Sequence, residues 1–176
     1  MKFKKIVPLA LTLAIASTTA AEAARLPQNR FSFTVRPGYT QTVSRPSEST
    51  AANSSYAAQV VSLVNAERAR QGLPALTIDT KVQQAAQTRA GELQTSFSHT
   101  RPSGASCFTA LTEASVSYAR AGENIACGQS TPEAVAQSWM NSSGHRANIL
   151  SSSFTTIGVG YTVVNGTAYW AQLFTA

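Results

Sequence analysis

Apolar residues recur every three or four positions along two stretches of the chain, which is the spacing of one face of an α-helix. The first predicts a helix over residues 54–71, with Ser54 or Ser55 as the N-cap and Gly72 as a stop signal. The second predicts a helix from an Asp79 cap to about Leu93. The inward positions of the two helices are Val60, Val61, Val64, Val82, Ala85, Ala86, Ala90 and Leu93.

Two shorter helices are predicted further along the chain. Ser130-Thr131-Pro132-Glu133 offers a capping box from Ser130 to Glu133, with a proline at an early helical position. Ser143 is placed to cap a short helix that ends near residue 150. His145 would then lie in its first turn, where the helix dipole favours the neutral imidazole. That form binds metals and accepts protons.

The C-terminal residues have the pattern of a β-hairpin. Two β-rich runs, 156–164 and 167–175, flank Asn165-Gly166, the preferred pair of a type I′ turn. Counting back from the turn places Val159 opposite Gln172. One face of the hairpin is bulky, the other is mostly small because of Gly158 and Gly160, and neither is polar. Both faces therefore need cover, which predicts an α+β fold, a three-layer α-β-α sandwich with a small antiparallel central sheet ending in this hairpin.

The first part of the chain lacks the pattern of a folded domain. Residues 1–23 combine a basic start, an apolar run and Ala21-Glu22-Ala23, which predicts a Sec-type signal peptide cleaved after Ala23. Residues 24–53 are rich in Ser, Thr and Pro and predict a flexible basic tether. Residues 54–176 form the one predicted domain. We therefore expect a secreted or periplasmic monomer without a transmembrane segment in the mature chain, a retained N-terminal anchor being the alternative.

The charge distribution argues against a nucleic-acid partner. The formal net charge is +6, and removal of the leader, with three lysines and one glutamate, leaves +4. Of this, +3 falls in the tether, so the folded domain is nearly neutral. A nucleic-acid site would gather Lys and Arg on a folded face. The tether arginines fit either attraction to anionic cell-surface polymers or an ordinary solubilising linker.

Cys107 and Cys127 are the two cysteines of the chain. In an exported protein an even pair predicts a disulfide, and closing this loop would stabilise the fold by about 3 kcal/mol. The bond would also fix the segment that contains Glu123. A thiol nucleophile or a two-cysteine metal site is a weaker interpretation because the chain lacks CxxC spacing.

The chain has two histidines, and each lies in a polar run. His99 precedes and His145 follows a buried-looking segment that contains Glu123. If the fold brings these three side chains together, they form one site for metal binding or proton transfer. The alternative is that all three serve as structural hydrogen-bond partners.

Six short motifs occur in a fixed order: Ser98-His99-Thr100, Gly122-Glu123-Asn124-Ile125-Ala126, Ser138-Trp139-Met140, Gly144-His145-Arg146-Ala147-Asn148-Ile149-Leu150, Ile157-Gly158-Val159-Gly160-Tyr161 and Tyr169-Trp170-Ala171-Gln172-Leu173-Phe174. Together they resemble the bacterial branch of the CAP superfamily, also called SCP domains. This superfamily groups cysteine-rich secretory proteins, venom allergens and pathogenesis-related proteins. The resemblance covers residues 56–174.

The resemblance implies a central cleft lined by two histidines and two acidic residues, which in some members holds zinc or another divalent ion. By motif, His99 and His145 match the histidines, as the metal ligands, and Glu123 matches one acid; these three form the candidate catalytic set. Ser142 stands at the position where the family has the second acid, and Glu113 and Glu133 are the candidates to substitute for that acid. We therefore expect weak metal binding. The implied cleft residues are His99, Glu123, Asn124, Ser142 and His145.

Three functions follow as hypotheses. The first is a binding module for a small hydrophobic or peptide ligand, or for a cell-envelope polymer. The second is a hydrolase of peptide or cell-wall amide bonds, with zinc on His99 and His145 and with Glu123 as general base. The third is a structural envelope protein.

Overall fold

A computed structural model describes residues 48–176, with side chains from Asn53 onward. The predicted signal peptide and most of the predicted tether lie outside the described residues. The elements, in chain order, are α1 (Glu48–Arg70), β1 (Thr77–Ile78), α2 (Thr80–Glu92), α3 (Thr109–Glu113), β2 (Ala121–Cys127), α4 (Pro132–Asn141), α5 (Ser143–Ile149), β3 (Thr156–Val164) and β4 (Thr167–Thr175). None of the helices in this part of the chain combines the length and apolarity needed to cross a membrane.

The four strands form a sheet in the order β1-β3-β4-β2. The hairpin of β3 and β4 turns at Asn165 (φ 50°) and Gly166 (φ 78°), and Val159 pairs with Gln172, so the predicted turn and register are confirmed. β2 joins β4 antiparallel. The two-residue β1 pairs parallel with β3, which makes the sheet mixed where an antiparallel one was expected.

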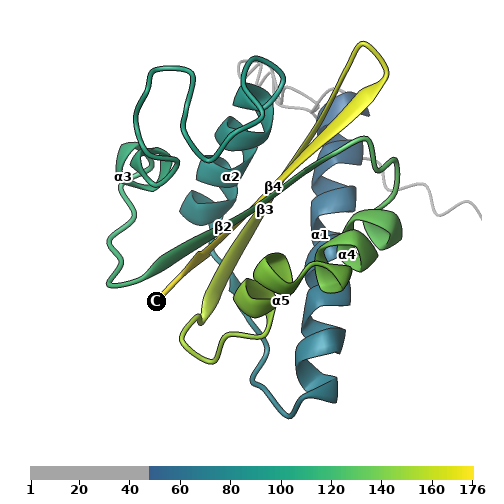
Figure 1. Cartoon of the computed structure of the whole chain (residues 1–176), viewed down its shortest axis with the longest axis vertical. Helices are drawn as coiled ribbons and strands as arrows, with labels where there is room; N and C mark the ends of the chain where they lie inside the picture. Colours follow the sequence, from purple (N-terminus) through teal and green to yellow (C-terminus); the bar gives the residue numbers. More distant parts are fainter. Residues whose placement is uncertain (1–47) are drawn as a thin grey trace, which may run out of the picture. The chain divides into compact units, whose positions relative to one another are not determined.

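Helices cover both faces of the sheet, so the predicted three-layer sandwich is confirmed. Figure 1 shows α2 and α3 on one side of the strands and α1, α4 and α5 on the other. The bulky face joins α1 and α4 in one buried cluster, whose members include Val60, Val61, Val64, Val135, Trp139, Ile157, Val159, Tyr161, Trp170 and Phe174. Burial of these large apolar side chains is the main source of stability for this layer.

The opposite face lies against α2 at very short range. A Cβ atom on Gly160 would lie 2.0 Å from the carbonyl oxygen of Ala86, and one on Gly158 would lie 2.4 Å from the backbone of Val82. Any side chain at these positions would push the helix outward, so the glycines set the spacing between α2 and the sheet. The predicted close approach of a helix is confirmed.

The two-residue β1 pairs only with the start of β3. Side chains of α2 form hydrogen bonds with the backbone of β3 beyond that point. The amide of Gln87 donates to the carbonyl of Tyr161 at 2.9 Å and accepts from its N–H at 3.2 Å. Gln83 makes the same pair of bonds with Val159. These two glutamines take the place of a neighbouring strand, and a covered edge resists pairing with other chains.

Several predicted helix starts differ from the structure. α1 begins at Glu48, inside the predicted tether, because no helix-breaking residue separates it from Ser54. α4 is capped by Thr131, whose hydroxyl accepts from the N–H of Ala134 at 3.2 Å, because Pro132 occupies the first helical position. α5 is preceded by Ser142 as its N-cap, where Ser143 was expected. α2 is capped by Asp79 as predicted, and α3 was not predicted.

Substitution of Gly160 by Ala tests the close approach of α2. We expect G160A to lower the free energy of unfolding by about 3 kcal/mol, because the added methyl group meets helix backbone that cannot rotate away. The measurement is urea unfolding followed by tryptophan fluorescence. The matched control is G91A within α2, where a Cβ meets nothing within 4 Å and better helix propensity should raise stability by up to about 1 kcal/mol. Equal effects of the two substitutions would contradict this account.

Candidate functional site

The carboxylate of Glu123 is the centre of the candidate site. It lies on β2 with only 1% of its side chain exposed, and Arg89, whose side chain is fully buried, donates from Nε to Oε1 at 2.8 Å. Nδ1 of His99 lies 2.7 Å from the other oxygen, Oε2. Because both oxygens have partners, the buried charge is compensated. The same contacts fix the orientation of the His99 ring, whose side chain is 58% exposed.

Further ion pairs hold the loop that contains His99. Arg89 contacts Glu92 at 2.6 Å and donates to the carbonyl of Ser98 at 2.7 Å. Arg101 bridges Glu92, at 2.5 Å, and Glu113, at 2.6 Å. Burial alone would raise the pKa of Glu92, but the hydrogen bonds from Arg101 and Arg89 lower it. The loop is therefore tied to α2 on one side of His99 and to α3 on the other.

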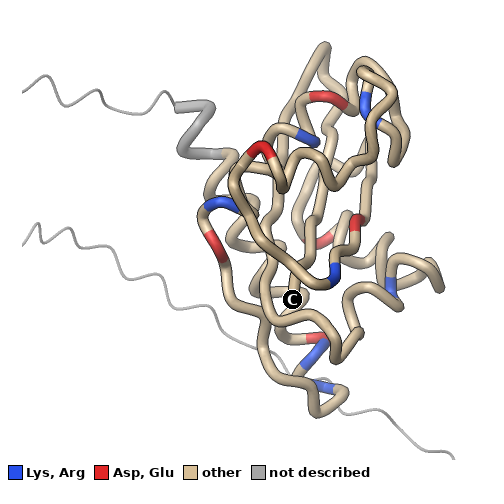
Figure 2. Tube along the Cα trace, turned by 90° about the vertical axis from the view of Figure 1, so that its left-hand side faces the viewer, with Lys and Arg blue, Asp and Glu red and all other residues tan. Residues whose placement is uncertain are grey.

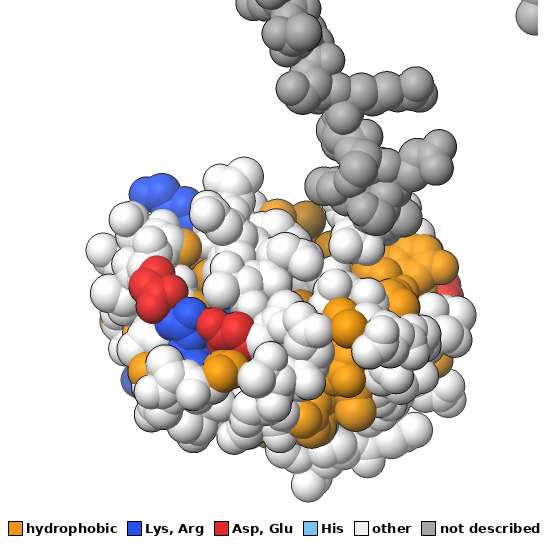
Figure 3. Space-filling model, turned by 90° about the horizontal axis from the view of Figure 1, so that it is seen from above, with side chains coloured by type: hydrophobic (Ala, Val, Ile, Leu, Met, Phe, Trp, Pro, Cys, Tyr) orange, Lys and Arg blue, Asp and Glu red, His pale blue; other side chains and the backbone are white. Residues whose placement is uncertain are grey.

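The charges of the domain are distributed in the same paired manner. Figure 2 shows acidic and basic residues interspersed along the described chain. Figure 3 shows acidic and basic side chains next to one another on the upper surface. Neighbouring opposite charges largely cancel at a distance, so on the surfaces seen in these figures a charged ligand would be attracted only at short range.

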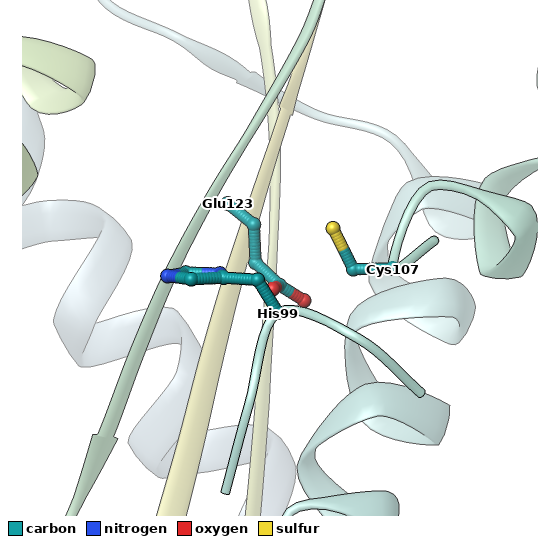
Figure 4. Close-up of side chains that lie close together, drawn as sticks. All are labelled: His99, Cys107 and Glu123. Carbon is teal, nitrogen blue, oxygen red and sulfur yellow. The ribbon is translucent and has the colours of Figure 1, made fainter. Parts of the chain in front are cut away.

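Cys107 is the third side chain of the site. Its N–H donates to the carbonyl of His99 at 3.0 Å, and Thr100 bridges to Ser106, so the loop doubles back and brings the thiol to the imidazole. Sγ of Cys107, a ring nitrogen of His99 and a carboxylate oxygen of Glu123 lie within 4.8 Å of one another (Figure 4). Burial, and then the charge of Glu123, raise the pKa of the thiol to about 11.

The predicted disulfide is wrong, since Cys107 and Cys127 are both free. The thiol of Cys107 lies at Glu123, whereas Cys127 is exposed at the far end of β2. Cys127 is four positions beyond Glu123 along β2, a distance of about 13 Å. Sulfur atoms in a disulfide lie about 2 Å apart, so these two thiols cannot join in this fold.

The backbone of α5 at His145 packs against the face of β2 opposite to Glu123. Successive residues of a strand point to opposite faces, so Glu123 lies toward α2 and Asn124 toward α5. Nδ2 of Asn124 donates to the carbonyl of His145 and to Oε1 of Gln172, both at 3.1 Å. Asn148 of α5 donates to the carbonyl of Glu123 at 3.2 Å and to Oδ1 of Asn124 at 2.9 Å. These amides fix α5 against β2.

The charge of His99 affects the protonation of His145. Burial, and then the positive charge of His99, lower the pKa of His145. His145 is thus kept in the neutral form that accepts a proton or binds a metal. The cluster of donor atoms around Glu123 includes His99 and Cys107 and does not include His145.

The remaining sequence candidates make other contacts than with Glu123. Ser142 separates α4 from α5, and its N–H donates to the carbonyl of Trp139. Glu113 pairs with Arg101, and Glu133 is exposed in the first turn of α4.

Sequence reasoning missed Arg89 and the position of Cys107. Arg89 could have been found, because it continues the inward stripe of α2 through Val82, Ala86 and Leu93. An arginine on a buried face requires a buried anionic partner. No comparable local signal pointed to Cys107, which reaches the site only through the path of the loop.

A surface hollow lies beside α5, close in sequence to His145. Its lining residues are Met140, Asn141, Ser143, Arg146, Ala147 and Leu150. The hollow combines apolar side chains with one guanidinium, a surface suited to a ligand with both apolar and anionic groups.

Residues 61–174 match the family described as CAP, cysteine-rich secretory protein family. The chain belongs to the CAP family. It is 46% identical over 123 residues to the uncharacterized protein YkwD of Bacillus subtilis, covering 69% of this chain and 47% of YkwD. It is 34% identical to the uncharacterized membrane protein YlbC of the same organism, covering 58% of this chain and 30% of YlbC. This CAP chain thus spans less than half the length of these curated relatives.

Solved structures have the same fold. An extracellular protein of Bacillus anthracis that contains an SCP domain aligns with a TM-score of 0.68 and 32% identity, over 74% of this chain and 43% of that one. A cysteine-rich secretory protein of Staphylococcus aureus aligns with a TM-score of 0.60 and 23% identity, over 74% of this chain and 41% of that one. The resemblance to the bacterial CAP branch is confirmed.

The reactivity of the two thiols tests the revised cysteine assignment. At pH 8 we expect iodoacetamide to label Cys127 rapidly and Cys107 slowly, because a thiol with a pKa of about 11 is ionised to about one part in a thousand at that pH. Peptide mass spectrometry measures both rates. Denaturation in guanidinium is the control and should make the rates equal. A native mass lower by two hydrogens, or equal labelling of the folded protein, would contradict the assignment.

The pKa of His145 tests the coupling between the imidazoles. NMR titration of the ring protons should give His145 a pKa below its ordinary 6.5, and His99→Gln should raise it, because a neighbouring positive charge is removed. As the pH falls through 6.5, His145 is protonated in the unfolded chain before it is protonated in the folded protein. The contribution of His145 therefore makes the free energy of unfolding decrease as the pH falls through this range. An unchanged His145 pKa in the variant would disprove the coupling.

Proposed function

We propose that this protein is an exported CAP-family binding protein whose ligand site lies at the edge of β2, around His99 and His145. The single observation that supports this is the buried Glu123, paired with Arg89 and holding His99 by Nδ1. The exposed part of the His99 ring is thereby presented to solvent in a fixed orientation. A preorganised polar group at the surface lowers the entropic cost of binding.

The bonding of Glu123 favours recognition over catalysis by that residue. Its Oε1 and Oε2 are occupied by Arg89 and His99. A general base needs an oxygen within reach of the substrate proton. In this site Glu123 therefore acts on His99 as a positioning residue, and the ligand meets the imidazole.

A divalent cation fits the two histidines weakly. His99 and His145 would supply imidazole nitrogens, which suit zinc, and a bound zinc ion would supply Lewis-acid chemistry. Ser142 stands where the resemblance implies a second acid, and Glu123 is engaged elsewhere. Two nitrogen donors without a free carboxylate make a weak and accessory metal site.

Export and the class of ligand complete the proposal. The leader pattern of residues 1–23 and the extracellular SCP protein of Bacillus anthracis both support a location outside the cytoplasm. The hollow with Met140, Leu150 and Arg146 beside α5 suits a peptide or hydrophobic ligand, or an envelope polymer with anionic groups.

The alternative function is hydrolysis of peptide or cell-wall amide bonds. The observation that favours it is the His99–Glu123 pair, because a buried carboxylate that orients an imidazole is also the arrangement of a general base. In this alternative His99 would be the base.

The test is an NMR titration of the chelator-treated chain with soluble peptidoglycan fragments and, separately, with anionic lipid vesicles. We expect saturable shifts at His99 and His145 with one of these probes, because the ligand would contact their imidazoles. His99→Ala should weaken binding at least about tenfold, the loss of one charge-assisted contact.

The control variant is Glu133→Gln, an exposed acid on α4, which should bind as the original chain does. Binding unaffected by His99→Ala, or no shift with either probe, would contradict the proposal. Release of products from peptidoglycan or casein that stops in Glu123→Gln would instead establish the hydrolase.

A further inference from the structure

The side of His99 that faces Glu123 has a different chemistry from the exposed side. Within the described part of the chain, His99, Cys107 and Glu123 are the one cluster of three potential metal ligands whose donor atoms lie within 4.8 Å of one another. Figure 4 shows the three side chains converging from β2 and from the loop before α3. A nitrogen, a sulfur and an oxygen donor thus lie around one small volume.

The spacing is close to that of a coordination shell. Zinc binds sulfur at about 2.3 Å and nitrogen or oxygen at about 2.0–2.1 Å, so neighbouring ligands of a tetrahedral ion lie about 3.5 Å apart. Nδ1 of His99 already lies 2.7 Å from Oε2 of Glu123. All three donor atoms lie within 4.8 Å of one another, so shifts of about 1 Å would bring them to the separations of a zinc coordination shell.

The surrounding charges also favour a cation. Arg89 and Arg101 contact Glu92, Glu113 and Glu123. Two arginines against three glutamates leave one negative charge when His99 is neutral. Arg89 binds Oε1 of Glu123 and leaves Oε2 on the side of His99. A cation at Oε2 would balance the network without competing for the contact made by Arg89.

The supporting shell holds all three ligands in place. The N–H of Cys107 donates to the carbonyl of His99, Arg89 holds both Glu123 and Ser98, and Arg101 anchors the loop to Glu92. Partners of this kind fix the orientation of metal ligands and strengthen binding.

We propose that Nδ1 of His99, Sγ of Cys107 and Oε2 of Glu123 form a site for a thiophilic cation of the zinc class. On binding, the thiol proton leaves to solvent and the imidazole proton moves from Nδ1 to Nε2, so no oxidant or reductant is needed. The thiolate selects zinc-class ions over magnesium and calcium.

This inference shares His99 with the proposed function but does not require any organic ligand. It differs from a histidine-only site in two respects: it uses Cys107, and it does not use His145. Because its test employs a metal alone, its failure would leave the proposed ligand binding untouched, and the reverse also holds.

The experiment is titration of the reduced, purified full chain with Co²⁺, a spectroscopic substitute for zinc. Thiolate coordination gives an intense sulfur-to-cobalt absorption band in the near ultraviolet. We expect this band to saturate at one equivalent, to disappear on addition of Zn²⁺, and to be unaffected by excess Mg²⁺.

Three variants assign the ligands. Cys107→Ser should abolish the band, the matched control Cys127→Ser should retain it, and His145→Ala should retain it as well. Circular dichroism checks that each variant is folded. Should Cys107→Ser not fold, the cadmium-113 chemical shift of the unmutated chain reports sulfur coordination directly.

Absence of the band and of a sulfur-type cadmium shift in the original chain would overturn the proposal. Loss of the band in Cys127→Ser would overturn it equally, because the sulfur would then come from the exposed thiol. Loss of the band in His145→Ala would also overturn it, because His145 would then be one of the ligands.

Discussion

The ion pair between Arg89 and Glu123 is the interaction on which the arrangement of the site depends. Both side chains are almost completely buried, and removal of one partner from such a pair typically costs about 3–5 kcal/mol because the other charge is left without compensation. The pair joins α2 to β2, and the remaining donors of Arg89 reach Glu92 and Ser98. A single guanidinium therefore connects the helix layer, the sheet and the loop that presents His99.

The position of Arg89 depends in turn on how closely α2 lies against the sheet. Gly158 and Gly160 remove the side chains that would hold the helix away, and Gln83 and Gln87 bind the backbone of β3 along its edge. Different positions of this one short helix therefore pack against the sheet, bond to the edge of β3 and supply the buried guanidinium. The chemistry of the site is an extension of the contacts that stabilise the fold.

The two faces of β2 carry different groups. Glu123 and Asn124 are adjacent in sequence and point to opposite faces, so Glu123 holds the ring of His99 on one face and Asn124 holds the backbone of α5 at His145 on the other. The face with His99 contains a carboxylate and a thiol, and the other face contains the amides of Asn124 and Asn148. The face with Glu123 thus combines charged and potential metal-ligating groups, whereas the face with Asn124 carries neutral hydrogen-bonding groups.

The sequence by itself determined the elements that local chemistry specifies: the Asp79 cap of α2, the Asn165-Gly166 turn with its register, and the close approach at Gly158 and Gly160. It also indicated His99, Glu123 and His145 through motif order. Only the tertiary structure decided that Cys107 faces Glu123 and not Cys127, that Arg89 neutralises Glu123, and that Asn124 holds the backbone of His145. Caps and turns are governed by neighbours within a few residues, whereas partners of buried charges and thiols are chosen by how distant segments pack.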